Sequence, residues 1–530
     1  MPLPRAAVRL GPIALALALA HSAAAARPAV PTSGGLAAHD GALVALNGDA
    51  RADALVRAHG GRLVFGRLDL WRLRGSTAAR LVPRLRRLGA LRYAEPERAR
   101  LEGVHFVDPL AGPDVAWHLY AVGADKVEPP GPGFPITVID AGVDLGHLDF
   151  LNRPNTVALN QQTTDFADLD EYHGTLVAST AAAATNGVGG EGVYPQAVLR
   201  AYDVEEATST AVVAGINAAL KAGPSVINLS LGGPVPALAE YEAIMLAVRS
   251  GSLVVAASGN SFEFGDPEEY PADFPHVLTA GAVDRSLHPA SFSSSGWAID
   301  LVAPGVEIPF ADPADPDPAR SVRVDGTSFA APIVSAAAAW LKTARPDLSV
   351  AQVAEALRRS ATDVGPPGFD RRSGFGLLNI PAALGAPAPA VDFLEPNDDV
   401  PQVTAALFGR AQAAVNGSRG HDARLTATID HAEDPHDVYR VVVPAAKRIV
   451  ATTSSPVNLR AALWAAQAST VANGRTQRLA FSNRPGSSTE SVAWTNKTKR
   501  AATVYLDVST AGDGIRGGYT ASIKLVRAPR

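Results

Sequence analysis

The sequence predicts a doubly wound α/β domain with a parallel sheet in the middle of the chain, flanked by a small α+β unit and an all-β module. Between residues 105 and 385, short apolar segments alternate with helical segments such as TSTAVVAGINAALKAG and PALAEYEAIMLAVRS. The apolar segments show little polar/apolar alternation, which is typical of parallel strands buried on both faces. They are PITVID (135–140), VINLSLG (226–232), LVVAAS (253–258) and HVLTAGAV (276–283). In such sheets ligands bind beyond the carboxyl ends of the strands.

The N-terminal segment is typical of a secretory signal. It carries Arg5 and Arg9, then a short apolar run, then the small residues Ala24, Ala25 and Ala26. We therefore expect residues 1–26 to be a signal peptide and the protein to be secreted, either extracellular or in the periplasm or at the cell surface. The alternative is a disordered Ala-rich tail. The apolar run is too short for a spanning helix, and no membrane span is predicted.

The unit at residues 40–100 has the element order of a ferredoxin-like module. A strand (ALVALNG) precedes a helix (ARADALVRAHG), and one or two alternating strands follow (GRLVFGRLDLWRLRG). A second helix (STAARLVPRLRRLG) and a closing strand (LRYAEPER) complete the unit. The β-α-β-β-α-β order predicts the ferredoxin-like fold.

A linker rich in Pro and Ala, LGAPAPAVDFLEPNDD, ends the α/β pattern. Strand-like segments then recur, namely VYRVVVPA, RIVATTSS, AATVYLDVST and GGYTASIKLV. We expect residues 387–530 to form this linker and a small β-sandwich.

The composition indicates the class of protein and excludes cysteine-based sites. The 530 residues are 47% hydrophobic and 19% charged, which indicates a globular protein of several domains. The net charge of −5 gives no indication of a nucleic-acid partner. Because the sequence contains no cysteine, disulfides, thiolate metal sites and a cysteine nucleophile are excluded.

Three polar residues, far apart in the chain, have chemistry that fits together. Asp140 ends an apolar strand, His173 starts a helical segment, and Ser328 starts an Ala-rich segment. A serine hydroxyl needs a base to become a nucleophile, an imidazole can be that base, and a buried carboxylate can orient the imidazole. Taken singly, the three residues are also consistent with a turn former, a capping residue and a helix N-cap.

The segments around these residues resemble the motifs of the subtilisin-like serine proteases (peptidase S8 family). VIDAGVDLGHLDF resembles the aspartate motif, HGTLVAS the histidine motif and DGTSFAAPIVS the serine motif. VINLSLGG, VVAASGN, YPADFPHVLTAGAV and FSSSGWAIDLVAPG are similar to further family segments. The chain order Asp, His, Ser agrees with the subtilisin order. The resemblance extends from Asp108 to Leu384 and implies a subtilisin-like catalytic domain at residues 104–386.

This resemblance implies roles for four residues. Ser328 is the expected nucleophile, His173 the general base and acid, and Asp140 the orienting carboxylate. Asn260, in AASGN, is the expected side chain of an oxyanion hole, which it shares with the backbone N–H of Ser328.

Two positions near these residues carry further expectations. Ala141 stands where the family often has Ser or Thr, so one hydrogen bond to the Asp140 carboxylate is expected to be missing. Pro332 is expected in the first turn of the helix that Ser328 opens, where a missing N–H does little harm.

The flanking units also resemble known modules. Residues 27–103 resemble the family's propeptide, which assists folding, inhibits the enzyme and is removed; an unrelated N-terminal domain is the alternative. Self-cleavage is expected near residues 98–105, before FVDPLAGPDVAWHL. The C-terminal module resembles the bacterial prepeptidase C-terminal domain through FLEPNDD, DPHDVYRVVVPAA and GGYTASI. The alternative for that module is a sandwich that only adds solubility.

The resemblance further implies an extended peptide substrate beside SLGG and AASGN, held by main-chain hydrogen bonds. The residues expected to line the main pocket are Ser230, Leu231, Gly232, Ala257, Ser258 and Gly259. In the family, residues just before the YP pair approach the pocket floor, and here these are Glu268 and Glu269, with Asp266 nearby. We therefore hypothesise a preference for Arg or Lys before the scissile bond. The alternative is that this acidic loop is only solvated.

The sequence therefore predicts a secreted serine endopeptidase, made as a zymogen, that works through an acyl-enzyme. Its expected partners are protein or peptide substrates and its own propeptide as an intramolecular inhibitor, and no cofactor is expected for catalysis. Calcium is common in the family, but the matching loop TNGVGGEG (185–192) offers few of the several oxygen ligands that calcium needs, so no metal ligand is assigned. The alternative is a catalytically inactive surface protein that binds through the C-terminal sandwich.

Overall fold

The computed structural model describes residues 42–65, 69–96, 108–162, 172–205, 207–311, 321–390, 392, 394–472, 475–486 and 488–528. The predicted signal peptide and the whole predicted cleavage region, residues 98–105, lie outside the described residues. The chain divides into two compact units, Met1–Leu101 and Glu102–Arg530.

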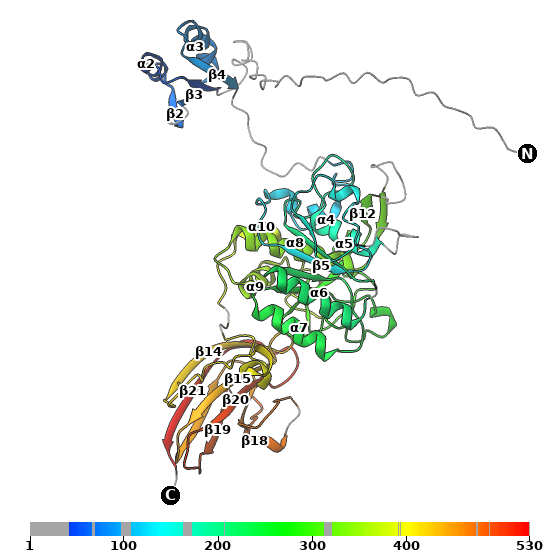
Figure 1. Ribbon diagram of the computed structural model, residues 1–530, viewed down its shortest axis with the longest axis vertical. Helices are drawn as coiled ribbons and strands as arrows, with labels where there is room; N and C mark the ends of the chain where they lie inside the picture. The colour runs from blue at the N-terminus through cyan, green and yellow to red at the C-terminus, as the bar shows by residue number, and fades with distance from the viewer. Residues whose placement is uncertain are drawn as a thin grey trace, which may run out of the picture. The chain divides into compact units, whose positions relative to one another are not determined.

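The first unit is an antiparallel four-stranded sheet packed with two helices (Figure 1). Its strand order is β2-β3-β1-β4, and Val44, Trp71 and Leu85 are buried in its core. The elements are β1 (Ala42–Leu46), α2 (Ala50–Ala58), β2 (Arg62–Phe65), β3 (Leu70–Leu73), α3 (Gly75–Arg87) and β4 (Leu91–Pro96). The predicted β-α-β-β-α-β order is confirmed.

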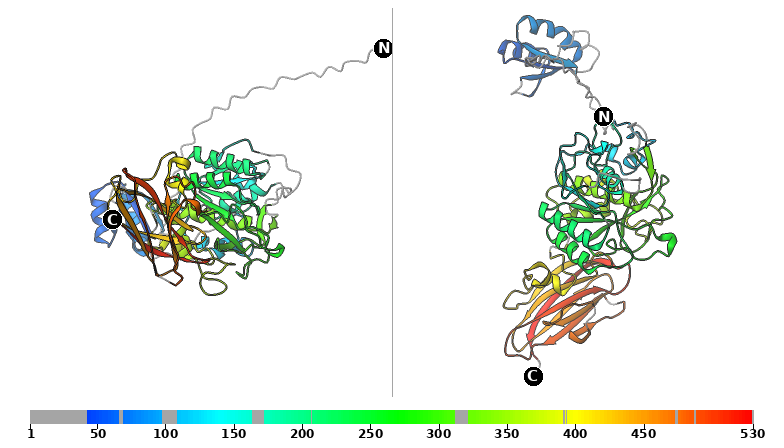
Figure 2. Two further views of the ribbon diagram at one scale, coloured as in Figure 1. Left: turned by 90° about the horizontal axis from the view of Figure 1, so that it is seen from below. Right: turned by 45° about the vertical axis from the view of Figure 1, so that its right-hand side comes forward.

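A seven-stranded sheet lies at the centre of the second unit, and all its strand pairs are parallel (Figures 1 and 2). Its order is β11-β10-β9-β8-β5-β7-β6. The strands are β5 (Ile136–Asp140), β6 (Thr156–Ala158), β7 (Leu199–Asp203), β8 (Val226–Leu229), β9 (Leu253–Ala257), β10 (Val277–Val283) and β11 (Ile299–Pro304). Strands β7 and β6 lie on one side of β5, whereas the later strands β8 to β11 lie on the other side. The strand order therefore switches between β5 and β8, and in open α/β sheets ligands bind at the carboxyl ends of the strands at such a point.

Helices cover both faces of this sheet. Helices α6 and α7 share a core with Ile139 and Ile227, whereas α5 and α8 share one with Val138 and Val255. The helices are α4 (Trp117–Ala121), α5 (His173–Ala182), α6 (Ser209–Ala222), α7 (Leu238–Arg249), α8 (Thr327–Ala344), α9 (Val350–Ser360) and α10 (Ile380–Gly385). A small antiparallel pair, β12 (Ile308–Ala311) and β13 (Ser321–Val324), precedes α8.

Helix α8 carries the Ala-rich segment and is buried at every residue from Phe329 to Leu341. Its small alanine side chains allow a close approach to the middle of the sheet, so the predicted buried helix is confirmed. None of the described helices is long and apolar enough to cross a membrane.

The C-terminal part of the second unit is a sandwich of two antiparallel four-stranded sheets, ordered β14-β21-β16-β19 and β15-β20-β17-β18 (Figure 1). Two short helices, α11 (Val400–Val403) and α12 (Ala405–Phe408), precede it. The strands are β14 (Ala423–Asp430), β15 (His436–Val443), β16 (Lys447–Ser454), β17 (Leu459–Ala465), β18 (Arg478–Ser482), β19 (Thr489–Thr495), β20 (Ala502–Thr510) and β21 (Arg516–Arg527). The predicted β-sandwich is confirmed, and alternate residues of its strands fill one apolar core.

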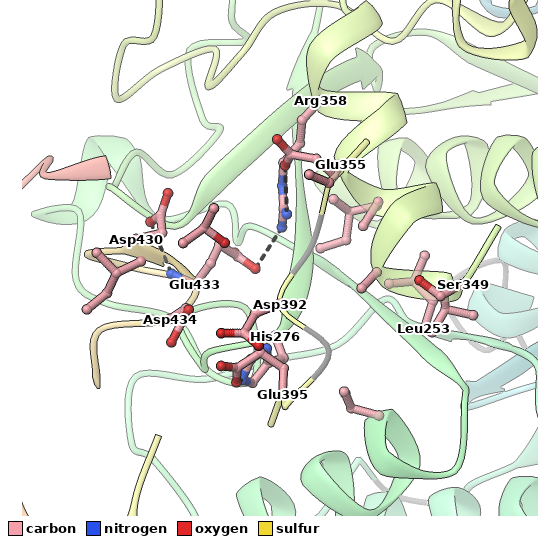
Figure 3. A pocket seen from close by; sticks show the side chains of 18 of the residues that line it. Leu253, His276, Ser349, Glu355, Arg358, Asp392, Glu395, Asp430, Glu433 and Asp434 are labelled. Atoms are coloured by element: carbon pink, nitrogen blue, oxygen red, sulfur yellow. Dashed lines mark hydrogen bonds and ion pairs between the residues drawn. The ribbon is translucent and has the colours of Figure 1, made fainter. Parts of the chain in front are cut away.

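Two arginines join the sandwich to the α/β domain. Arg358 of α9 lies 2.7 Å from Asp300 of β11 and 2.7 Å from Glu433, which precedes β15 (Figure 3). Arg516 of β21 stacks over the ring of Phe369, 3.8 Å from its centroid. Because Arg358 is 13% exposed and its two partners are 1% and 12% exposed, this ion pair network is largely removed from water.

We expect Arg358→Met to lower the free energy of unfolding by about 3–5 kcal/mol, because two buried carboxylates lose their cation. Equilibrium unfolding in urea measures this loss. The control is the neighbouring Arg359→Met, since Arg359 is 57% exposed and pairs with Glu355. That surface pair is worth about 1 kcal/mol or less. Equal losses in the two variants would contradict the proposed importance of the junction.

Candidate active site

Asp140 and His173 are paired at the carboxyl end of β5. Asp140 is the last residue of the strand and is 2% exposed, and His173 is the first residue of α5. The Nδ1 atom of His173 lies 2.7 Å from Oδ1 of Asp140, and the N–H of Ala141 also donates to Oδ1, at 2.8 Å. The other oxygen, Oδ2, is buried and has no hydrogen-bond partner among the described residues. This agrees with the hydrogen bond expected to be missing because residue 141 is alanine.

Gly174 allows this pair to form. Its N–H donates to the carbonyl of Ala141 at 2.6 Å, which holds the start of α5 against the end of β5. A Cβ at residue 174 would lie 2.7 Å from that carbonyl oxygen and 2.5 Å from a methyl group of Val143. Only glycine therefore permits the backbone approach that brings His173 to Asp140.

Ser328 is the second residue of α8, and it lies at the same edge of the sheet. Phe329, the next residue, packs its ring 5.8 Å from the ring of His173. The Ser328 hydroxyl donates to the carbonyl of Ser230, just beyond β8, at 3.3 Å. The N-cap of α8 is Gly326, so Ser328 is not the cap of this helix. Its position in the first turn places its N–H near the positive end of the helix dipole.

The expectation for Pro332 was wrong. Helix α8 begins at Thr327, so Pro332 lies in the second turn, where its missing N–H would have donated to the carbonyl of Ser328. The hydroxyl of Ser230 donates to that carbonyl instead, at 2.7 Å. Ser230 was predicted only as a pocket wall, but its hydrogen bonds hold Ser328 from both sides. Sequence spacing carries no signal for this contact, because the two residues are 98 positions apart.

Asn260 follows β9 and lies beside the start of α8. Its Oδ1 accepts hydrogen bonds from the N–H of Thr327 at 3.0 Å and from the hydroxyl of Thr327 at 2.9 Å. These bonds fix the orientation of the amide. Its Nδ2 group is left as the donor on the exposed side, which suits a hydrogen bond to an oxygen atom of a ligand.

The predicted pocket residues flank Ser328 on two segments. Ser230, Leu231 and Gly232 follow β8, whereas Ala257, Ser258 and Gly259 end β9 and continue beyond it. Next to them, Gly233 and Tyr270 exchange two backbone hydrogen bonds of 2.9 and 2.8 Å. The structure thus places the six residues at the carboxyl ends of β8 and β9.

Glu269 packs directly against Gly259. Gly259 has φ of +97°, and a Cβ there would lie 2.6 Å from Cγ of Glu269. The Glu269 side chain is 7% exposed and accepts a hydrogen bond from the hydroxyl of Ser261 at 2.7 Å. Its backbone N–H donates to Asp273, and burial together with Glu268, Glu269 and Asp266 raises the pKa of Asp273 to about 6. The acidic group at this wall is therefore larger than the sequence indicated.

The loop at 185–192 contacts two carboxylates from outside it. Asp108 accepts hydrogen bonds from the N–H groups of Asn186 and Gly187, and Asp149 accepts one from Gly190. The sequence pattern pointed only to carboxylates within the loop. These contacts show what holds the loop in place, and they assign no metal ligand.

Comparisons with known proteins identify relatives of the α/β domain. A family model described as the subtilase family matches residues 131–376. Subtilisin E of Bacillus subtilis (strain 168) is 37% identical over 259 residues, which are 48% of this chain and 66% of that protein. Subtilisin of Bacillus pumilus is 36% identical over 259 residues, which are 48% of this chain and 91% of that protein. Among solved structures, fervidolysin from Fervidobacterium pennivorans, a keratinolytic enzyme related to subtilisin, matches over 92% of each chain with 19% identity and a TM-score of 0.49.

The raised pKa of Asp273 predicts a pH-dependent stability. The pKa is about 6 in the folded protein against 3.8 as the ordinary value, so folding favours the protonated form. The contribution of Asp273 to the free energy of unfolding is therefore complete below about pH 4. It is lost as the pH rises through about 6. We expect Asp273→Asn, which resembles the protonated acid, to raise Tm at pH above about 6 and to match the parent near pH 4. A Tm difference that does not change between these pH values would contradict the assignment.

Proposed function

Because the chain belongs to the subtilase family of serine proteases, we propose that it is an exported serine endopeptidase, made as a zymogen, that uses Asp140, His173 and Ser328. The observation that carries the proposal is the 2.7 Å contact between the imidazole of His173 and the buried carboxylate of Asp140. This pair faces the start of the helix that holds Ser328. It lies at the carboxyl end of β5, the edge at which ligands bind in such sheets.

The proposed reaction begins with the imidazole. Asp140 accepts the Nδ1–H of His173, so Nε2 is available to take the proton of Ser328 as its Oγ bonds to the scissile carbonyl carbon. The same proton passes to the leaving amine nitrogen when the C–N bond breaks. A water oxygen then bonds to the acyl carbon while His173 takes one of its protons. When the bond from that carbon to Oγ breaks, His173 gives the proton to Oγ, and the acid is released.

Two donors would stabilise the negative oxygen that forms in each step. One is Nδ2 of Asn260, held in place by its two hydrogen bonds to Thr327. The other is the backbone N–H of Ser328, in the first turn of α8, where the helix dipole adds a partial positive charge. Both donors are in place before any substrate binds, so no reorganisation is needed during the reaction.

The first unit is proposed to be the propeptide. Its ferredoxin-like fold and its position before the α/β domain support an assistant of folding and an intramolecular inhibitor. Secretion is supported by the signal-like N-terminal segment and by family membership.

We expect a fluorophosphonate probe to label the purified, self-processed protein, from which the inhibitory first unit has been removed, because an activated serine attacks its phosphorus atom. Ser328→Ala should abolish the label. Asn260→Ala should keep the label and lose roughly 100- to 1000-fold in kcat, which is the loss known for the corresponding donor in a subtilisin. Failure of the folded parent to react would favour the alternative of an inactive binding protein.

The substrate preference rests on Glu269. We propose that this residue favours Arg or Lys before the scissile bond, because its carboxylate lies behind Gly259 at the predicted pocket. Asp266, Glu268 and Asp273 add negative charge to the same wall. The hydrogen bond from Ser261 supports the competing interpretation, in which Glu269 only holds the loop together.

A peptide panel decides between these interpretations. We expect Glu269→Gln to lower the ratio of kcat/KM for Arg over Leu by about 10-fold or more, since a hydrogen bond to a charged group is worth about 1.5–3 kcal/mol. The control is Glu263→Gln, an exposed acid in the nearby turn Phe262–Phe264, which should leave the ratio unchanged. Parent cleavage mainly after Leu or Phe would dismiss the preference while leaving the proposed triad intact.

A further inference from the structure

The segment that carries Asn260 is held in place by a second segment, residues 292–297, which is called the supporting segment below. Ser294 makes two of the contacts. Its N–H donates to the carbonyl of Gly259 at 2.9 Å, and its hydroxyl oxygen accepts a hydrogen bond from the N–H of Ser261 at 3.0 Å. Because these two bonds lie immediately before and after Asn260, they restrict the direction in which its amide can point.

Two further contacts extend this support along residues 259–266, the pocket segment. The N–H of Phe262 donates to the carbonyl of Phe292 at 3.1 Å. Ser295 donates to both carboxylate oxygens of Asp266, from its N–H at 2.8 Å and from its hydroxyl at 2.5 Å. The Asp266 carboxylate is therefore fixed against the supporting segment, and the pocket segment is held along most of its length.

Arg372 joins the two segments. Its guanidinium carbon lies 3.6 Å from the centre of the Phe262 ring, which is an attractive cation–π geometry. Its Nη1 and Nη2 atoms donate to the carbonyls of Ser293 and Ala290, each at 2.8 Å. A planar guanidinium can make these bonds and cover the ring at the same time. Arg372 thus fixes the Phe262 side chain relative to the supporting segment.

The turn that carries Arg372, residues 369–375, has a well-defined position of its own. The backbone groups of Asp370 and Gly374 exchange two hydrogen bonds of 3.2 and 2.8 Å, and Oδ1 of Asp370 accepts the N–H of Arg372 at 2.8 Å. Gly374 has φ of +59°, and a Cβ there would lie 2.3 Å from the carbonyl oxygen of Asp300 in β11. The turn is therefore closed by its own hydrogen bonds and packs closely against the sheet.

The sandwich contacts both the turn and the supporting segment. The guanidinium of Arg516, in β21, lies 3.8 Å from the centre of the Phe369 ring and donates to the carbonyl of Trp297 at 3.3 Å. The rings of Trp297 and Phe369 are stacked on one another, with centroids 5.9 Å apart. Gly514 has φ of +67° and lies so close to Trp297 that a Cβ would be 2.6 Å from its ring. One short stretch of the sandwich therefore contacts both segments that hold the pocket segment.

From these shared contacts we infer that the C-terminal sandwich positions the pocket segment of the α/β domain, with Arg372 as the positioning residue between them. The inference rests on the proposed function, because it concerns the oxyanion donor and the pocket wall of that site. The competing interpretation is that these contacts only add stability to the junction.

The expected consequence is kinetic. The triad residues lie on other elements, namely β5, α5 and α8, so loss of this support should leave the triad in place. Asn260 should then be less precisely oriented. An oxyanion donor accelerates the reaction only if it is in position before the charge develops. We therefore expect a lower kcat from sites that remain reactive.

Arg372→Met tests the positioning role in the self-processed protein. The kcat is divided by the fraction of sites that a fluorophosphonate titrates, so that unfolded protein does not count. We expect kcat to fall by about 10-fold or more, since a misplacement of about 1 Å can cost about 100-fold. Arg372→Lys should recover only part of this loss, because an ammonium group lacks the planar fork.

A double-mutant cycle separates positioning from a general loss of stability. If Arg372 acts through Asn260, then Arg372→Met should cost at least about 3-fold less in kcat when residue 260 is already alanine. A merely structural role would lower kcat by the same factor with and without the Asn260→Ala change, and that result would overturn the positioning role.

Arg516→Met tests the contribution of the sandwich. We expect kcat per titrated site to fall by about 3- to 10-fold, which is within the range measured for coupling through residues that contact no ligand. The matched control is Arg478→Met, because Arg478 makes a similar contact on the same sandwich, 4.2 Å from the centre of the Phe481 ring. The control should keep the parent kcat. A parent-like kcat in Arg516→Met would overturn the inference.

Hydrogen exchange gives a readout that does not depend on activity. It uses the full chain with Ser328→Ala, so that proteolysis does not interfere. The N–H groups of Ser261 and Phe262 donate to the supporting segment, so their exchange should be about 10-fold faster or more when either Arg372 or Arg516 is replaced by Met. The control variant should exchange like the parent.

The two kinds of measurement distinguish the two proposals. A parent that neither reacts with the fluorophosphonate nor cleaves peptides would contradict the proposed function, while faster exchange in the two variants would still support the positioning by the sandwich. Unchanged exchange in both variants would overturn the inference whether or not the parent is active.

Discussion

The proposed active site depends on one buried charge. Asp140 ends a strand that is buried on both faces, and a carboxylate in that position is stable only if donors compensate for its lost water. The imidazole of His173 and the N–H of Ala141 provide this compensation at Oδ1. The contact that compensates for the burial of the Asp140 carboxylate also orients the imidazole of His173. Folding of the sheet and assembly of the site are therefore one event.

The serine is positioned by a second constraint, which is the burial of α8. Alanines let this helix pass close to the sheet. Its first turn contacts Ser230, just after β8. Pro332 then removes the donor that would satisfy the carbonyl of Ser328, and Ser230 replaces it. The hydrogen bond that Pro332 removes from the helix is thus replaced by one that links Ser328 to the segment after β8. Thr327 makes a comparable link to Asn260, so the start of α8 is held on two sides.

Buried charges join the sandwich to the α/β domain. Arg358 joins Asp300 and Glu433, and the carboxylates around Glu395 meet His276. Buried ion pairs add little stability relative to apolar packing, but they strongly disfavour any arrangement that separates the partners. This chemistry favours one fixed geometry of the junction.

Much of the fold and the central residues of the site were predictable from the sequence. Apolar strands without alternation and the helices between them determine a parallel sheet, because only such a sheet buries both faces of its strands. The motifs around Asp140 and His173 predicted that these two residues meet, and the structure contains the contact between the imidazole and the carboxylate. Tertiary structure alone decided that Ser230 holds Ser328, that Glu269 packs behind Gly259, and that acids of the linker meet His276. Each of these contacts joins residues with no fixed spacing in the chain, so only the packing of complete elements brings them together.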